Sequence, residues 1–323
     1  MAKQSVDLGV WRTPLEKADQ LGAALGLHAG DLWVKRDDWL GFGGGGNKLR
    51  KLERLCATAL ADGATTLVAS GAAQSNFARL TAASARRLGL GVTLVLRTPP
   101  AARRGERTGN LTLDGLLGAD VIWADDPLDE AVADAAEQLT RAGERPAVFP
   151  LGGSNADGAR GYAECAREIL TDLPDVAHVV TPVGSGGTMA GLVCVLGPER
   201  VLGGHVGAID QPRRTVAQLA TELHPGSPTT PEELRLDEAV AGDGYELPTP
   251  ASRAAMDLAA RHEGLLLDPV YGAKAAAALT SAIHREEITP GQRVVLLLTG
   301  GLPGLLGHPL ATDLAARTHA APV

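Results

Sequence analysis

The sequence predicts an α/β protein with two mostly parallel sheets, each flanked by helices. From about position 65 to the end, short apolar runs rich in β-branched residues alternate with Ala-rich amphipathic segments, a rhythm typical of strand–helix–strand units. The 323 residues also correspond to about two domains at roughly 150 residues per domain. Because four predicted strands precede residue 150 and three follow it, two sheets are more natural than one.

Each element follows from its side-chain pattern. Short continuous apolar runs indicate strands buried in a parallel sheet. They predict strands at 66–69, 92–96, 120–123, 147–149, 178–183, 204–209 and 293–298. The amphipathic segments between them predict helices at 75–88, 128–141, 159–170, 188–196 and 272–285.

Composition narrows the function class. Hydrophobic residues make up 45% and charged residues 21%, which is typical of globular proteins and excludes intrinsic disorder. The net charge of −8 offers no electrostatic footprint for nucleic acid or an anionic membrane. With no signal-like N-terminus and no apolar run of membrane length, we expect a cytoplasmic protein. The cysteines and histidines show neither disulfide nor metal-ligand spacing, and no Gly-x-Ser-x-Gly motif supports a hydrolase triad.

The first candidate site is a lysine after a glycine run. Residues 43–46 are all glycine and lead through Asn47 and Lys48 into an apparent helix. The chain has only six lysines against 24 arginines, and a lysine amine can lose its proton and form a Schiff base, which an arginine cannot. Lys48 is therefore a candidate covalent site, and the alternative is a flexible turn before a helix.

The second candidate is a glycine-rich turn between a strand and a helix. A strand, a glycine-rich turn and a helix N-terminus together form a phosphate-binding arrangement, in which backbone N–H groups and hydroxyls donate to the anion. The turn consists of Gly184, Ser185, Gly186, Gly187 and Thr188. Met189 breaks the dinucleotide fingerprint, although Asp210 stands where a ribose-binding acid is expected, so an NAD(P) oxidoreductase stays an alternative. Plain helix–sheet packing is the other interpretation.

Five further residues have side chains that could serve a site. Ser75 and Asn76 open a predicted helix and could bind a carboxylate, although helix capping alone also explains them. Thr299 follows the last strand, at the edge where open α/β sheets bind ligands. Tyr245 and Tyr271 lie in turn-like settings, where a phenol can act as an acid or base or simply pack.

These signals occur together in an order that resembles the D-cysteine desulfhydrase and 1-aminocyclopropane-1-carboxylate deaminase family of pyridoxal-phosphate enzymes. The resemblance runs from Thr13 to about Pro309, over nearly the whole chain. It implies a two-domain tryptophan synthase β-like fold (PLP fold type II). The large domain is then formed by residues 1–49 and 159–323, and the small inserted domain by residues 50–158.

The same resemblance implies roles for the candidate residues. Lys48 holds the cofactor as a Schiff base, and the turn 184–188 with Lys51 holds its phosphate. Asn76 meets the pyridine 3-hydroxyl, and Thr299 meets the ring nitrogen. Ser75 binds the substrate carboxylate or transfers a proton. Tyr245 and Tyr271 line the substrate side. A small amino acid is the implied substrate, and a homodimer is the implied assembly.

Three departures from the family pattern refine the expected activity. The tyrosine matching Tyr271 is followed by glutamate in the deaminases but by Gly272 here, and those deaminases lack a threonine at the position of Thr299. Both differences favour α,β-elimination of a β-substituted alanine, giving a keto acid and ammonia, over ring opening. Phe77 and Trp39 are also unusual and predict a more apolar substrate side chain than that of cysteine. The alternatives are an aminocyclopropane-carboxylate deaminase, an L-cysteate-type lyase and a non-catalytic paralogue.

Overall fold

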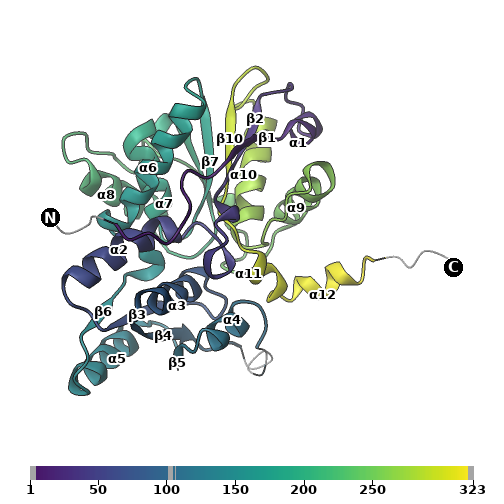
Figure 1. Cartoon of the computed structure of the whole chain (residues 1–323). Coiled ribbons are helices and arrows are strands. Elements are labelled where there is room, and N and C mark those ends of the chain that lie inside the picture. The colour runs from purple at the N-terminus through teal and green to yellow at the C-terminus, as the bar shows by residue number, and fades with distance from the viewer. Residues whose placement is uncertain (1–4, 101–104, 106, 319–323) are drawn as a thin grey trace.

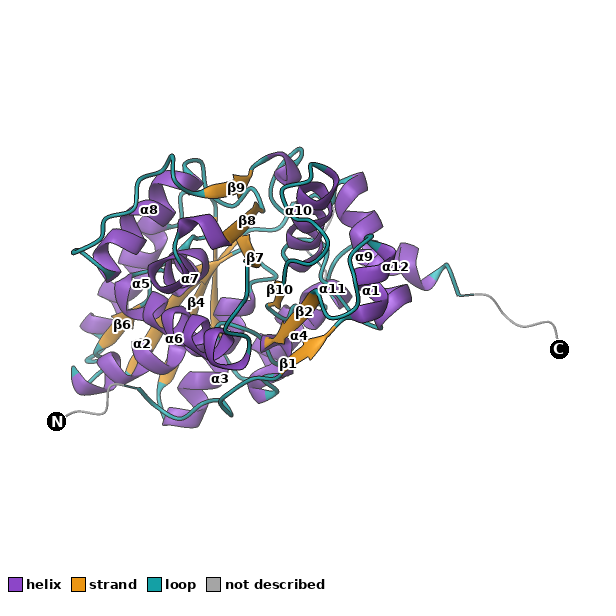
Figure 2. Ribbon diagram, turned by 90° about the horizontal axis from the view of Figure 1, so that it is seen from above, coloured by secondary structure: helices purple, strands orange, loops and turns teal. Residues whose placement is uncertain are grey.

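The computed structural model describes residues 5–100, 105 and 107–318. Within these residues the chain folds into two mostly parallel sheets with helices on both sides (Figures 1 and 2). The helices are α1 (Asp19–Ala24), α2 (Leu49–Ala61), α3 (Asn76–Leu88), α4 (Asn110–Leu116), α5 (Asp129–Arg141), α6 (Ala156–Asp172), α7 (Gly187–Leu196), α8 (Pro212–Leu223), α9 (Pro250–Glu263), α10 (Gly272–His284), α11 (Leu302–Leu306) and α12 (Leu310–Ala315).

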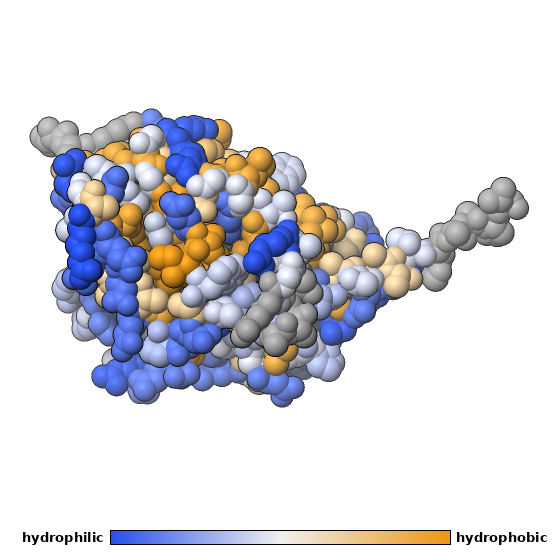
Figure 3. All heavy atoms as spheres, turned by 90° about the horizontal axis from the view of Figure 1, so that it is seen from below, coloured by the Kyte–Doolittle hydropathy of each residue, from blue (hydrophilic) through white to orange (hydrophobic). Residues whose placement is uncertain are grey.

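The smaller sheet is formed by one continuous stretch of the chain. Its strand order is β5-β4-β3-β6, and every neighbouring pair is parallel. The strands are β3 (Thr66–Gly71), β4 (Gly91–Arg97), β5 (Asp120–Ala124) and β6 (Pro146–Val148). All of β3 is buried, because helices pack on both of its faces. Figure 3 views this end of the molecule from below and shows hydrophobic residues among hydrophilic ones.

The larger sheet combines strands from both ends of the chain. Its order is β1-β2-β10-β7-β8-β9, and only the β1–β2 pair is antiparallel. The strands are β1 (Leu15–Lys17), β2 (Leu32–Arg36), β7 (His178–Val183), β8 (Val201–His205), β9 (Arg235–Asp237) and β10 (Val294–Leu298).

The two faces of the larger sheet carry separate cores. In β10, Val294, Leu296 and Leu298 pack with the residues of α1, α9 and α10, whereas Val295 and Leu297 pack with those of α6, α7 and α8. This is the alternation expected of a strand covered on both sides. It explains why this strand is a continuous apolar run in the sequence.

The structure confirms the α/β class with two mostly parallel sheets and corrects one predicted strand. The prediction at 204–209 is wrong in its bounds, because β8 ends at His205 and residues 206–209 form a connection. Two positions inside β8, Gly203 and Gly204, are glycine because neighbouring atoms leave no room for a side chain. A Cβ at Gly203 would lie 2.6 Å from Val183 Cγ2, and one at Gly204 would lie 2.9 Å from the Lys274 backbone oxygen. The domain boundaries at 49/50 and 158/159 stay a prediction.

Candidate active site

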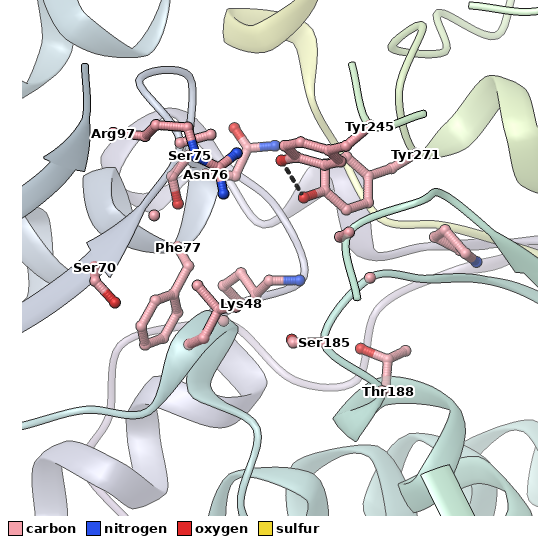
Figure 4. Close-up of a pocket in the computed structure, with 18 of the residues that line it drawn as sticks. Lys48, Ser70, Ser75, Asn76, Phe77, Arg97, Ser185, Thr188, Tyr245 and Tyr271 are labelled. Carbon is pink, nitrogen blue, oxygen red and sulfur yellow. Dashed lines mark hydrogen bonds between the residues drawn. The ribbon is translucent and has the colours of Figure 1, made fainter. Parts of the chain in front are cut away.

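A cavity of about 310 Å³ lies where the carboxyl ends of strands from both sheets meet. Ser70 and Gly71 end β3, Arg97 ends β4, Gly184 follows β7 and Thr299 follows β10, and all five line the cavity. This is the edge at which open α/β sheets bind ligands, and the volume is at the lower end of the range for small-molecule sites. Figure 4 shows side chains converging on it from several elements.

Lys48 enters the cavity from the start of α2 (Figure 4). Its Nζ donates to Asn47 Oδ1 at 3.3 Å and lies 5.9 Å from the centre of the Tyr271 ring. Burial lowers the pKa of this amine to about 8, and the nearby Asp268 carboxylate partly opposes the shift. A neutral amine is the form that attacks a carbonyl, so this environment favours a nucleophilic lysine.

The glycine-rich turn 184–188 forms a donor-rich wall of the cavity. Gly186 has φ of 87°, a left-handed conformation that suits glycine, and α7 begins at the next residue. Gly184, Ser185, Gly186 and Thr188 line the cavity directly. Gly187 does not line it; its N–H donates to Ser154 Oγ at 3.1 Å.

Lys51 lies beneath the same wall and is 1% exposed. Its Nζ donates to Ser154 Oγ at 2.9 Å and to the Gly152 carbonyl at 3.1 Å, and Ser154 Oγ lies 2.7 Å from Ser185 Oγ. Burial lowers the pKa of this amine, and Lys48 lowers it further. Within the described part of the chain Lys51 forms no ion pair. A buried amine beside hydroxyls and a helix N-terminus fits an anion such as a phosphate, whose charge would favour the protonated amine.

Ser75 and Asn76 begin α3 at the opposite wall. Ser75 caps the helix, since its Oγ accepts from the Ala78 N–H at 3.1 Å. Its hydroxyl hydrogen remains available to a ligand, because the capping bond uses only an oxygen lone pair. Both residues line the cavity, so capping and ligand binding are compatible at this helix start.

Tyr245 and Tyr271 form a hydrogen-bonded pair on the third side (Figure 4). Their hydroxyl oxygens are 2.7 Å apart, and the rings meet edge to face at 77°. Burial raises the pKa of both phenols, so both stay protonated at neutral pH. The pair can therefore donate or relay a proton at the cavity surface.

The structure brings the sequence-predicted side chains together and adds others. Of the predicted catalytic and cofactor-binding residues, all except Gly187 line the cavity. Phe77 lines it as well, but the expectation for Trp39 was wrong, because Trp39 is 57% exposed and does not line it. Thr299 also joins the walls, because its carbonyl accepts from the Asn47 N–H at 3.0 Å. Ser154 was given no role from sequence, although it binds Lys51 and lies beside Ser185. Asp268 was also missed; its carboxylate accepts from the N–H groups of Val270, Tyr271 and Gly272 and thereby fixes the Tyr271 backbone.

The described residues offer neither a cluster of metal-binding side chains nor a helix that could cross a membrane. Residues 5–100, 105 and 107–318 hold no group of three or more His, Cys, Asp or Glu side chains placed to bind a metal ion. No helix in those ranges has the length and apolar character needed to cross a membrane.

A comparison with known families identifies the chemistry of this cavity. The model of the "Pyridoxal-phosphate dependent enzyme" family matches residues 6–300, which include every lining residue. The chain belongs to this family. Pyridoxal phosphate is therefore its cofactor, and the predicted NAD(P) alternative is not supported. Among the described residues, Lys48 and Lys51 are the two lysines that line the cavity, and the surroundings of Lys51 at the turn 184–188 suit a phosphate group.

Similar proteins agree with this membership. The chain is 39% identical over 315 residues to a D-cysteine desulfhydrase of Yersinia pestis (strain Pestoides F), covering 92% of this chain and 94% of that protein. It is 38% identical over 325 residues to a D-cysteine desulfhydrase of Serratia proteamaculans (strain 568), covering 94% and 96%. A crystal structure of an "ACC deaminase homologue" superimposes with a TM-score of 0.85 at 31% identity, covering 97% and 96%. The predicted tryptophan synthase β-like fold (PLP fold type II) is confirmed.

Proposed function

We propose that this protein is a lyase that eliminates the β substituent of a small amino acid, with D-cysteine or a related β-substituted alanine as substrate. The observation that carries the proposal is the similarity to D-cysteine desulfhydrases over nearly the full length of both chains. The geometry supports it, because elimination needs a base, a carboxylate anchor and a proton donor around one cavity.

The side chains divide this work between the walls. The hydroxyl of Ser75, at the start of α3, binds the substrate carboxylate. Lys48, whose pKa is near 8, removes the Cα proton as its Nζ becomes free to accept it. The Tyr245–Tyr271 pair donates a proton to the departing β substituent. When bound, pyridoxal phosphate supplies the electron sink that makes the Cα proton acidic.

The residue after Tyr271 supports elimination over cyclopropane ring opening. Gly272 is buried at the start of α10, and its N–H donates to Asp268 Oδ1 at 2.8 Å. A Cβ at this position would lie 3.3 Å from that same carboxylate oxygen. The backbone here serves the Asp268 cap, and the position has no side chain to offer the carboxylate that the deaminases have.

The test compares kcat/KM for keto-acid release from D-cysteine, β-chloro-D-alanine, L-cysteate and aminocyclopropane carboxylate. The ratio reports differential stabilisation of the transition states. We expect a clear preference for D-cysteine and β-chloro-D-alanine. A preference for aminocyclopropane carboxylate contradicts the argument from Gly272, and a preference for L-cysteate selects the L-cysteate-type lyase. A yellow protein that turns over none of them takes a different substrate, accommodated by Phe77, or is the non-catalytic paralogue.

Two finer expectations belong to the same proposal. We propose a cytoplasmic location, which suits an enzyme of small amino acids, and cell fractionation tests it. We also propose a homodimer. A mass in solution near twice the chain mass of 33.2 kDa is the expected result of light scattering.

A further inference from the structure

Arg79 is a fully buried arginine on α3 that binds three separate parts of the site. Its exposed fraction is 0%. Nε donates to Asn110 Oδ1 at 2.8 Å, and Nη2 donates to Asn76 Oδ1 at 3.2 Å and to the Gly45 carbonyl at 2.7 Å. Nη1 donates to the Gly43 carbonyl. All of these partners are neutral acceptors that lie near the cavity, so the guanidinium is committed to holding them in place.

The guanidinium determines which way the Asn76 amide faces. An arginine side chain can only donate, so the amide atom that faces it must be the oxygen. Asn110 is oriented by the same rule, with its Oδ1 toward Arg79. Its Nδ2 then donates to Asn76 Oδ1 at 3.1 Å and to the Gln74 carbonyl at 2.8 Å. Asn76 Oδ1 thus accepts two hydrogen bonds from the side away from the ligand.

The other half of the Asn76 amide is left for the cavity. Asn76 lines the cavity beside Ser75 (Figure 4). Its Nδ2 forms no hydrogen bond with any described residue. Asn76 is half-buried, so this amide donor without a protein partner stands at the cavity wall, where it can bind a ligand acceptor.

Arg79 also holds the loop that leads to Lys48. Gly44 has φ of 86°, and a Cβ there would lie 2.9 Å from Arg79 Nη1. The glycine therefore lets the backbone approach the guanidinium closely enough for the two carbonyl bonds. Through this contact one side chain fixes both the approach to Lys48 and the amide of Asn76.

We propose that Arg79 is a positioning residue that turns the Asn76 amide so that Nδ2 donates to the ring oxygen of the cofactor, and that also anchors the loop 43–45 before Lys48. The inference rests on the proposed function in that the cavity must bind pyridoxal phosphate. Arg79 itself touches neither cofactor nor substrate, because it acts through Asn76 and the loop.

The test measures cofactor retention and the visible spectrum of the holoprotein as a function of pH. In Arg79→Met we expect at least about tenfold weaker retention of pyridoxal phosphate. A donor to an anionic oxygen favours the charged form, so its loss also raises the pH midpoint of the spectral transition. Asn76→Ala is expected to shift the midpoint in the same way. The double variant is expected to shift it no further, because both substitutions remove the same hydrogen bond, from Asn76 Nδ2 to the ring oxygen of the cofactor.

Arg86→Met is the matched control. Arg86 is on the same helix and donates to the Leu117 carbonyl at 2.7 Å, but it is exposed and does not line the cavity. It is expected to leave midpoint and retention unchanged. Asn110→Ala removes one hydrogen-bond donor to Asn76 Oδ1 while keeping Arg79. It serves as a second test if Arg79→Met does not fold, and we expect a smaller rise of the spectral pH midpoint.

Two results overturn the inference. The first is an Arg79→Met protein whose spectral pH midpoint and cofactor retention equal those of the wild type. If Arg79→Met does not fold, the same result in Asn110→Ala counts instead. Either result shows that the Asn76 amide does not depend on its hydrogen bonds to Arg79 and Asn110. The proposed function stands in that case, because the wild-type holoprotein still binds the cofactor. A wild-type protein that binds no pyridoxal phosphate rejects both the inference and the proposed function.

Discussion

Replacing Lys274 with methionine is expected to lower both the stability and the activity of the protein. Lys274 is on the first turn of α10 and is 0% exposed. Its Nζ donates to the carbonyls of Val206 at 3.1 Å, Ala241 at 2.8 Å and Gly244 at 2.9 Å. These acceptors lie just after β8 and in the segment that leads to Tyr245. The ammonium therefore ties the Tyr245 segment to the sheet edge.

The magnitude follows from the three acceptors. Methionine fills a similar volume but donates nothing, so three carbonyls lose their partner. One bond is buried and two are partly buried. A buried unsatisfied carbonyl costs about 1–3 kcal/mol and a partly solvated one less, which gives roughly 3 kcal/mol in all. Once the segment that leads to Tyr245 is no longer held, the hydroxyls of Tyr245 and Tyr271 lose their fixed separation. We therefore expect kcat for keto-acid release to fall by roughly 10- to 100-fold.

Urea unfolding followed by circular dichroism, together with kcat and KM, checks both effects. Lys17→Met is the control, because Lys17 is exposed and its amine lies over the Trp33 ring. It is expected to change the free energy of unfolding by about 0.5 kcal/mol or less. A Lys274→Met protein as stable and as active as the Lys17→Met protein refutes the reasoning.

Three further predictions follow. Gly186→Val places a β-branched residue at φ of 87° and a Cβ 3.3 Å from Val216 Cγ2. We expect it to weaken pyridoxal-phosphate binding, measured by dialysis, by more free energy than it removes from the stability of the fold, measured by thermal unfolding. Full cofactor retention at dilute protein contradicts this prediction. Gly191→Ala places a Cβ 2.3 Å from the Ala159 carbonyl oxygen, so α6 and α7 are forced apart and the urea midpoint drops, whereas an unchanged midpoint contradicts this packing. Because burial lowers the Lys48 pKa to about 8, the neutral fraction of the amine rises about fivefold from pH 7 to 8 and less than twofold from pH 8 to 9, and the rate of cofactor capture by the apoprotein is expected to follow it; a tenfold rise per pH unit up to pH 9 indicates an ordinary lysine.

The sequence pattern was sufficient for most strands that are buried on both sides, but the interior strand β2 was missed because Lys35 and Arg36 interrupt its apolar run. The run Val294–Leu298 is apolar throughout because helices cover both faces of β10. The short edge strands β1 and β9 were not predicted, since three residues with polar members give no periodic signal. The bounds of β8 were misplaced because its two glycines contribute no side chains to the pattern.

The candidate site shows the same division. Glycine-rich turns between a strand and a helix are local features, so the turn 184–188 and the start of α3 were visible in the sequence. The supporting contacts are not local. Lys51 and Ser154 are 103 residues apart, and Lys274 is 68 residues from Val206. No spacing rule links such pairs, and only the folded backbone places them together.

Reduction of the holoprotein with borohydride tests the central claim most directly. The treatment fixes the cofactor onto the lysine that holds it, and peptide mass spectrometry then locates the adduct. With only six lysines in the chain, the assignment is unambiguous. A single pyridoxyl adduct on Lys48 is the predicted result. An adduct on Lys51, Lys274 or any other lysine, or no adduct in a protein that binds the cofactor, contradicts the account.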